Sequence, residues 1–313
     1  MIRSSLPSPL PTIVACAAVV LGLVAPAAAG ADERVLARDQ QAVNLHAYRG
    51  VAVFSLKEGS RYALVASVAG GPPQPLAVPT QSHPFDADIG RGRDGAPTVV
   101  VRLCDEGASC SLSLLAPDGS APRSTGIDVP RADVHPTLWD GTIAWYEHGR
   151  VQTKARTLVR LEHGTRVLGL DLFGRELALN LDVPSPDAGV CGRRELRLLK
   201  IGAQHARVLG SQVCGLNGQT FKGPTFDSGW LYFARTCNTS CGASRFGAYR
   251  YRNGRYELAG DDRPLDDWAW GGHGSAYQVR AQDSVGCSDP DVGCTVVWTD
   301  GLTFKPVRAP IHS

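Results

Sequence analysis

The sequence predicts an all-β protein, specifically a six-bladed β-propeller built from four-stranded antiparallel blades. Three observations carry this prediction. Long helical patterns are absent from the chain. Short runs rich in Val, Leu, Ala, Tyr, Phe and Trp are broken by Gly, Pro and Asp, which is typical of strands and turns. A unit of an apolar run, a turn ending in Gly and a second β-rich run recurs with a period of about 45 residues, which is typical of propeller blades.

Composition limits the classes of function. The chain has 313 residues, 43% of them hydrophobic and 20% charged, which is enough for a large core and too apolar for a disordered chain. Lys and Arg number 32 against 30 Asp and Glu, so no basic surplus indicates nucleic acid or an anionic membrane as a partner.

The N-terminal segment is predicted to be a secretory signal peptide spanning residues 1–29. Arg3 is the only charged residue before Asp32, residues 13–24 form an apolar run, and Ala27-x-Ala29 is a small-residue cleavage pattern. The run falls short of the roughly 20 residues that cross a bilayer, and no later segment approaches that length. We therefore expect cleavage after Ala29 and a location outside the cell or on its envelope. Lipidation at Cys16 is the alternative, and the segment before that residue is poorly apolar.

The glycine that ends each recurrent turn marks the six units of the domain at residues 30–313. A two-residue hairpin turn needs positive φ, which Gly adopts without steric cost. These glycines are Gly50, Gly95, Gly141, Gly174, Gly229 and Gly274. The expected blades span roughly residues 40–80, 84–129, 132–163, 166–212, 220–260 and 264–310.

The two ends of the domain supply further strands. Residues 303–307 are expected to follow residues 295–299 as the outermost strand of the last blade. Residues 33–38 precede the first blade, and we expect them to pair with or pack beside the last blade and help close the ring. A frayed terminus is the alternative for this segment.

Three segments resemble exported bacterial propellers of the TolB-like or WD40-like kind, and more narrowly secreted propeller proteins of high-GC actinobacteria. They are YRGVAVFS at 48–55, PFDADIG at 84–90 and VVRLC at 100–104. The resemblance covers residues 35 to 310. It implies the fold and almost nothing about activity.

The cysteines indicate disulfides in an exported protein. Removal of Cys16 with the signal leaves eight cysteines, and an even number in an exported chain is typical of a disulfide framework. Zinc is the alternative for the Cys-x3-Cys pair at 237 and 241, although no His stands beside it. The cysteines fall into four neighbouring couples, Cys104–Cys110, Cys191–Cys214, Cys237–Cys241 and Cys287–Cys294.

Propeller geometry assigns sequence positions to the two ends of the ring. With strands a to d counted outward from the axis, the b–c loops and d–a connections share one end, which we call the loop face. The a–b and c–d turns share the other end, the turn face. All four cysteine couples fall on the loop face, so disulfides there are expected to hold loops of the kind that carry binding sites.

Residues near the start of each innermost strand are candidates for a binding site at the channel mouth on the loop face. Carboxylates dominate this set, and such a cluster can bind a cation, a basic peptide or a sugar, or supply an acid–base pair. The alternative is that they are turn residues and solvated groups. The candidates are Asp86, Asp88, Asp133, His135, Lys222, Asp266 and Asp267, with His46 and Asp171 beside them.

The favoured function is a non-catalytic binding module, expected to be a monomer, that engages a protein or a glycan through its disulfide-bearing loop face. No P-loop, G-x-S-x-G or H-E-x-x-H motif occurs, so we expect neither a cofactor nor a metal. The alternative is a propeller hydrolase or lyase acting on polysaccharide with carboxylates at the channel mouth. Trp268 and Trp270, near the acidic residues 261–267, are candidates for stacking on a sugar.

Mass mapping of the non-reduced secreted protein is expected to find the four local cysteine couples and no free thiol. A disulfide between two different loops outside these couples would contradict the predicted strand register.

Cys104→Ser is expected to lower the free energy of unfolding by roughly 2–5 kcal/mol without abolishing the fold.

Overall fold

A computed structural model shows a β-propeller in which every described element is a strand. Within this part of the chain, no helix has the length and apolar character to cross a membrane. The described residues are 32–38, 42–105, 109–185, 192–203, 205–213, 220–236, 247–260, 267–281 and 294–307.

The strands follow one another as antiparallel neighbours, and we name each consecutive group by its innermost strand. The β2, β6 and β10 groups contain β2 (Ala42–Tyr48), β3 (Val51–Glu58), β4 (Arg61–Val68), β5 (Gln74–Pro75), β6 (Ala87–Arg91), β7 (Pro97–Cys104), β8 (Cys110–Leu115), β9 (Arg123–Val129), β10 (Thr137–Trp139), β11 (Thr142–Glu147), β12 (Arg150–Thr153) and β13 (Thr157–Arg160). The β14, β18 and β22 groups contain β14 (Arg166–Phe173), β15 (Glu176–Val183), β16 (Arg193–Lys200), β17 (Arg207–Val213), β18 (Thr220–Asp227), β19 (Trp230–Thr236), β20 (Gly247–Arg252), β21 (Arg255–Gly260), β22 (Asp267–Gly272), β23 (Ser275–Ala281) and β24 (Cys294–Thr299).

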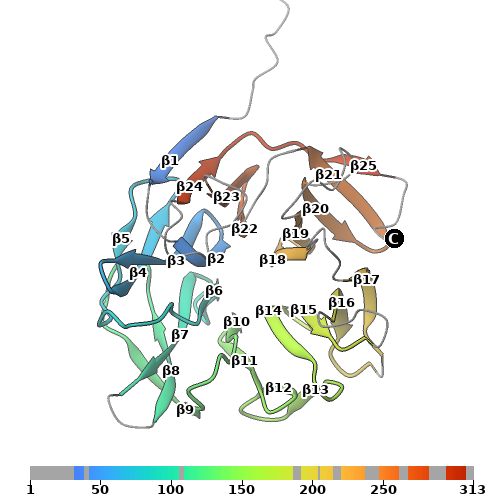
Figure 1. The fold of residues 1–313 in the computed structure, drawn as a ribbon, viewed down its shortest axis with the longest axis horizontal. Helices are drawn as coiled ribbons and strands as arrows, with labels where there is room; N and C mark the ends of the chain where they lie inside the picture. The colour runs from blue at the N-terminus through green and yellow to red at the C-terminus, as the bar shows by residue number, and fades with distance from the viewer. Residues whose placement is uncertain are drawn as a thin grey trace, which may run out of the picture. The chain divides into compact units, whose positions relative to one another are not determined.

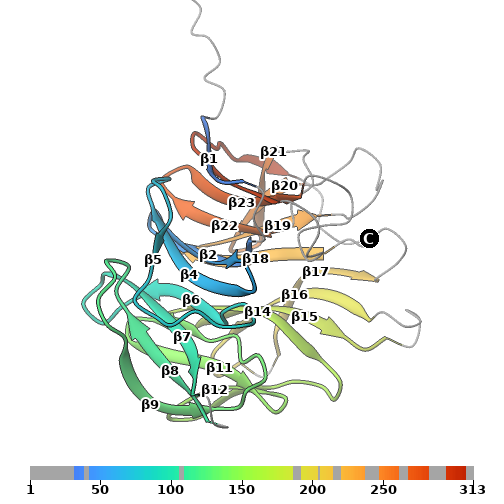
Figure 2. The same cartoon turned by 60° about the vertical axis from the view of Figure 1, so that its left-hand side comes forward.

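The groups surround a common centre (Figures 1 and 2). Each innermost strand contacts the innermost strands of the groups on either side, and β22 contacts β2, so the ring is closed. Apolar side chains from facing sheets fill the space between neighbouring groups. Phe54 and Val65, for example, share one buried cluster with Tyr277 and Val296.

The prediction of six separate four-stranded sheets is wrong as stated. Hydrogen bonds join the described strands into five sheets, of which three have four strands, one has five and one has eight. The eight-stranded sheet arises because β6 and β10 pair in parallel through Arg91 and Trp139. Gly90 permits this close approach, since a Cβ at that position would lie 1.9 Å from the carbonyl oxygen of Leu138.

Four of the six predicted glycine turns are confirmed as two-residue turns that end in Gly, whereas Gly95 lies in a longer connection at 92–96 and Gly174 begins its turn rather than ending it. All six glycines lie between the first and second strands of their groups and have positive φ, from 59° at Gly174 to 86° at Gly274. In four of these turns the preceding residue also has positive φ, which defines the type I′ hairpin turn. Those residues are Arg49, Asp140, Ser228 and His273.

Both ends of the domain add strands to the edges of the ring. Strand β1 (Glu33–Ala37) pairs antiparallel with β24, as expected, and takes the outermost position of the last sheet. The expectation that residues 303–307 occupy that position is therefore wrong. Strand β25 (Lys305–Val307) pairs instead with β21 and makes the β18 group five-stranded.

Aromatic side chains connect the innermost strands at the turn face. They come from the last residues of β2, β10 and β14 and from the penultimate residue of β18. Tyr48 meets Trp139 edge to face with ring centroids 6.1 Å apart, Trp139 lies 4.2 Å from Phe173, and Phe173 stacks at 5.5 Å on Phe226. The contact between Tyr48 and Trp139 links β2 directly to β10, past β6.

Gly90→Ala is expected to lower the free energy of unfolding by roughly 3 kcal/mol, because the new methyl group collides with the main chain of β10. Gly174→Ala is the matched control: its φ is strained for Ala, but no atom lies within 4 Å of the added Cβ, so the cost is about 1–2 kcal/mol. Urea unfolding measures both. An unchanged stability of Gly90→Ala would contradict the close packing of β6 on β10.

Candidate functional site

Three of the predicted channel-mouth acids hold neighbouring strand groups together. The Asp86 carboxylate accepts hydrogen bonds from the main-chain amides of Val134 at 2.6 Å and His135 at 3.1 Å, just before β10. The Asp267 carboxylate, at the start of β22, accepts one from the amide of Leu45 in β2 at 2.8 Å. These carboxylates are bonded within the protein rather than free for a ligand.

Asp171 makes the same kind of link between β14 and β18. Its Oδ2 accepts a hydrogen bond from the amide of Phe226, and its Oδ1 accepts one from the amide of Leu172 at 2.7 Å. The Thr137 hydroxyl lies 3.3 Å from Oδ1 and connects β10 to this network. Both oxygens of this buried carboxyl are therefore occupied.

Asp133 and His135 belong to a polar hub between β7 and the chain before β10. The buried guanidinium of Arg102 lies 3.3 Å from the Asp133 carboxylate and 3.9 Å from that of Asp86. It also donates to the carbonyl oxygens of Arg131 and Ala132. Arg102 and Asp86 are buried, whereas Asp133 is exposed. The two carboxylates neutralise the buried positive charge of Arg102.

His46 and Asp88 form an ion pair between β2 and β6, with Nδ1 and Oδ1 3.1 Å apart. Burial lowers the pKa of His46, but the hydrogen bond and charge of Asp88, with the charges of Asp267 and Asp171, outweigh it and raise the pKa above 6.5. The second oxygen of Asp88 is buried and has no hydrogen-bond partner.

Asp171 has one property of a catalytic acid. Burial, reinforced by the charge of Asp88, raises its pKa well above the usual value, although the amides of Phe226 and Leu172 and the charge of His46 oppose this shift. A glycosidase pairs such a carboxyl with a second one across a substrate cleft. Asp171 lines none of the cavities described below, and its oxygens bond to the protein.

The predicted site residues thus do not form one ligand site in the part of the chain that the structure describes. Lys222 lies half-buried on β18, and Asp266 lies outside the described residues. None of the predicted acids lines a described cavity. Among the described residues, no group of three or more His, Cys, Asp or Glu side chains is placed to hold a metal ion.

The predicted Cys104–Cys110 disulfide is confirmed, and it joins the end of β7 to the start of β8. Cys294 is also disulfide-bonded. The remaining cysteines of the predicted couples lie outside the described residues, and they are Cys191, Cys214, Cys237, Cys241 and Cys287.

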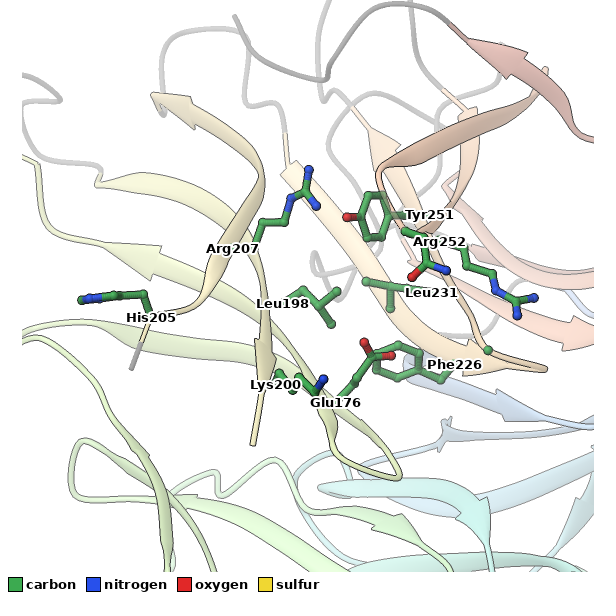
Figure 3. A pocket seen from close by; sticks show the side chains of 11 residues that line it. Glu176, Leu198, Lys200, His205, Arg207, Phe226, Leu231, Tyr251 and Arg252 are labelled. Atoms are coloured by element: carbon green, nitrogen blue, oxygen red, sulfur yellow. The ribbon is translucent and has the colours of Figure 1, made fainter. Parts of the chain in front are cut away.

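A cavity of about 250 Å³ lies between the β14 and β18 groups on the turn face (Figure 3). Leu198, Leu231 and Tyr251 form its apolar centre, with Arg207 beside the Tyr251 ring at 5.5 Å and Lys200 near Glu176. Its full lining is Glu176, Leu198, Lys200, His205, Arg207, Phe226, Gly229, Leu231, Tyr251, Arg252 and Asn253.

A second cavity of about 570 Å³ lies on the same face, between the β18 and β22 groups, and we call it the aromatic cavity. The turns at Arg49, Ser228 and His273 contribute to its rim, and Leu302 comes from the segment before β25. Its wall contains four aromatic side chains, Trp230, Tyr232, Trp270 and Phe304.

The wall of the aromatic cavity is held in place by contacts among its own residues. Tyr232 and Trp270 stack with centroids 4.2 Å apart and planes 3° from parallel. The Arg250 guanidinium lies 4.4 Å from the Trp230 ring and 4.8 Å from that of Phe304, and a hydrogen-bonded ion pair with the buried Glu257 fixes it. A surface fixed in this way binds a rigid ligand with little loss of side-chain entropy.

Sequence reasoning missed this cavity because its residues come from turns far apart in the chain. Only Trp270 was a candidate, as a residue that stacks on a sugar. A signal was present in the turns, since Trp230 directly follows Gly229 and His273 precedes Gly274. Neighbouring turns of a propeller lie on one face, so polar and aromatic residues beside the recurrent glycines indicate a candidate site on the turn face.

No protein-family model matches the chain, and no curated protein matches its sequence. Among solved structures it is similar to the β-propeller domain of the Trilobed protease from Pyrococcus furiosus, which has an open velcro topology. That similarity has 7% identity, a TM-score of 0.46, and coverage of 86% of this chain and 83% of that one.

Two further similarities are as distant. One is to a structure from a study of two prolyl endopeptidases, with 13% identity, a TM-score of 0.44, and coverage of 86% of this chain but only 42% of that one. The other is to the WD40 domain of Toxoplasma gondii coronin, with 12% identity, a TM-score of 0.39, and coverage of 87% and 86%. The propeller architecture accordingly rests on strand pairing and not on these similarities.

NMR titration is expected to give His46 a pKa above 6.5. Asp88→Asn removes the hydrogen-bonded charge while keeping the shape, so it lowers that pKa. Because the folded pKa lies above the unfolded one, the ion pair stabilises the fold fully below pH 6.5, and this stabilisation is lost as pH rises through the folded pKa. An identical pKa in the two proteins would contradict the pairing.

Proposed function

We propose that the protein is a non-catalytic binding module that recognises a glycan in the aromatic cavity of the turn face. The observation that carries this proposal is the wall of four aromatic side chains around a cavity of about 570 Å³, with polar groups at its rim. This combination, an apolar surface with a few fixed polar groups, is the usual composition of a small-ligand site.

The chemistry of the rim suits a sugar. A pyranose presents an apolar C–H face and a periphery of hydroxyl groups. The partly exposed rings of Trp230 and Phe304 offer a surface for the former, and Ser228 and His273 offer hydrogen-bonding groups for the latter. Asp227 is fixed at the rim by a 3.1 Å hydrogen bond from the Trp270 indole.

A longer glycan would reach the cavity of Figure 3 across the β18–β19 turn. The two cavities flank the β18–β19 turn, because Asp227 and Ser228 line one and Phe226 and Gly229 line the other. The proposed site therefore differs from the loop face that the sequence suggested. Residues 186–191 and 237–246, which the sequence assigns to loops of that face, lie outside the described residues.

We further infer that the ring has six blades and that the protein acts after export. The eight-stranded sheet consists of two consecutive four-strand groups joined by a single parallel residue pair, so we count it as two blades. Export rests on the signal-peptide pattern of residues 1–29 and on the even number of cysteines in the chain that follows.

Trp230→Ala is expected to weaken glycan binding by about tenfold or more, because it removes a stacking surface and releases Arg250. Isothermal titration calorimetry of the purified secreted protein against neutral and acidic oligosaccharides measures this. His273→Asn, which tolerates the positive φ of 52° at that position, tests the polar rim.

Val68→Ala is the control, because Val68 is an exposed apolar residue outside the cavity. Thermal unfolding of each variant shows whether the fold is intact. Binding of no oligosaccharide, or equal affinity in folded Trp230→Ala, would overturn the glycan proposal. Binding of a peptide ligand that depends on Trp230 would instead assign the cavity to a protein partner.

A further inference from the structure

A third cavity, of about 550 Å³, lies on the loop face of the β10 group and is unusually basic. It is formed by the β11–β12 turn, the ends of β12 and β13 and the connection from β13 to β14. Three arginines and two histidines line it, namely Arg150, Arg160, Arg166, His148 and His163. We call it the basic cavity.

The arginines of the basic cavity are not neutralised. Among the described residues, Arg150, Arg160 and Arg166 take part in no ion pair with a carboxylate within 4 Å. Glu162 is the acid among the lining residues, and it pairs with Arg197 at 3.7 Å. Glu147 lies 3.8 Å from His148. The three arginines therefore carry more positive charge than the carboxylates beside the cavity balance.

The strand register adds a repulsive contact at the same place. Arg150 and Arg160 stand directly opposite each other on β12 and β13. Like charges in this position destabilise a pair of strands. A bound anion between them would relieve the repulsion.

An unpaired hydroxyl group supplies an independent observation. Thr165 lines the basic cavity and is 4% exposed, and its Oγ1 has no hydrogen-bond partner. Its main chain is satisfied, because the amide bonds to the carbonyl oxygen of Glu162 and its own carbonyl accepts from the Tyr146 hydroxyl. A buried hydroxyl without a partner is rare in proteins unless a ligand or water completes it.

We propose that the basic cavity binds a tetrahedral oxyanion, the sulfate or phosphate group of a ligand. Guanidinium groups suit such an anion because their planar N–H donors match two of its oxygens at once. The Thr165 hydroxyl would donate to a third oxygen from the cavity wall. This site lies on the opposite face from the aromatic cavity and does not depend on the proposed glycan function.

Thermal unfolding of the whole secreted protein in sulfate, phosphate or chloride at matched ionic strength tests the proposal. Sulfate or phosphate is expected to raise the unfolding temperature logarithmically with concentration above Kd, by about 5 °C at a hundredfold excess over Kd. Chloride is expected to give no such rise. Calorimetry with a sugar sulfate, a sugar phosphate and the unmodified sugars then distinguishes the two sources of the anion.

Two variants separate binding from folding. Thr165→Val removes the unpaired hydroxyl, so it is expected to keep or raise the unfolding temperature without anion and to weaken anion binding severalfold. Arg160→Gln removes the repulsion with Arg150, so it is expected to raise the unfolding temperature at low salt and to abolish most of the anion-induced shift. Arg156→Gln, an exposed site in the same group outside the cavity, is the control.

Two results would overturn the proposal. An equal rise with sulfate in the parent, Arg160→Gln and Thr165→Val proteins would show a general salt effect. A lower unfolding temperature of Arg160→Gln without anion would show that Arg160 stabilises the fold through the protein alone.

Discussion

Hydrogen bonds from main-chain amides to aspartate carboxylates of the preceding strand group connect neighbouring groups of this ring. Asp86, Asp171 and Asp267 stand in alternate groups, and each accepts an amide of the group that follows. Apolar contact between sheets is non-directional, whereas these hydrogen bonds fix the position of one group relative to the next. Asn44 and Asn180 make links of the opposite polarity, in which the side chain is the donor. Each donates to a carbonyl oxygen of the following group. A buried amide or carboxylate left without this partner would cost roughly 1–3 kcal/mol, more for the charged group.

This constraint decides which residues remain for ligands. Acids near the centre bond to the ring itself, so the chemistry free for recognition moves outward to the turns and loops. There the sheets leave aromatic rings fixed by arginine on one face and arginines without carboxylate partners on the other. The acidic contacts between strand groups thus lie near the centre of the ring, and the two proposed binding cavities, one aromatic and one basic, lie at its periphery.

The repeat predicted the propeller because glycine at a positive φ is a local requirement that sequence displays directly. Strand β1 was also predictable, since a β-rich run outside the six units needs an edge to pair with. The partner of β25 was not, because three residues pair as well with one exposed edge as with another. The roles of Asp86 and Asp267 were likewise undetermined, because an aspartate beside a strand is equally compatible with solvent, a ligand or a neighbouring amide. The basic cavity depends on Arg150 facing Arg160, a register that composition does not specify.

The pairing of β1 with β24 also sets an order of events. Glu33 lies opposite Thr299, so β1 cannot form these hydrogen bonds until β24 has been synthesised. Contacts between such distant parts of a chain form slowly, and until then β1 and β24 both present unpaired edges. A chain with such a long-range strand pairing is most exposed to aggregation and proteolysis in the interval before β1 and β24 meet. We therefore expect the pairing of β1 with β24 to be a late step in folding.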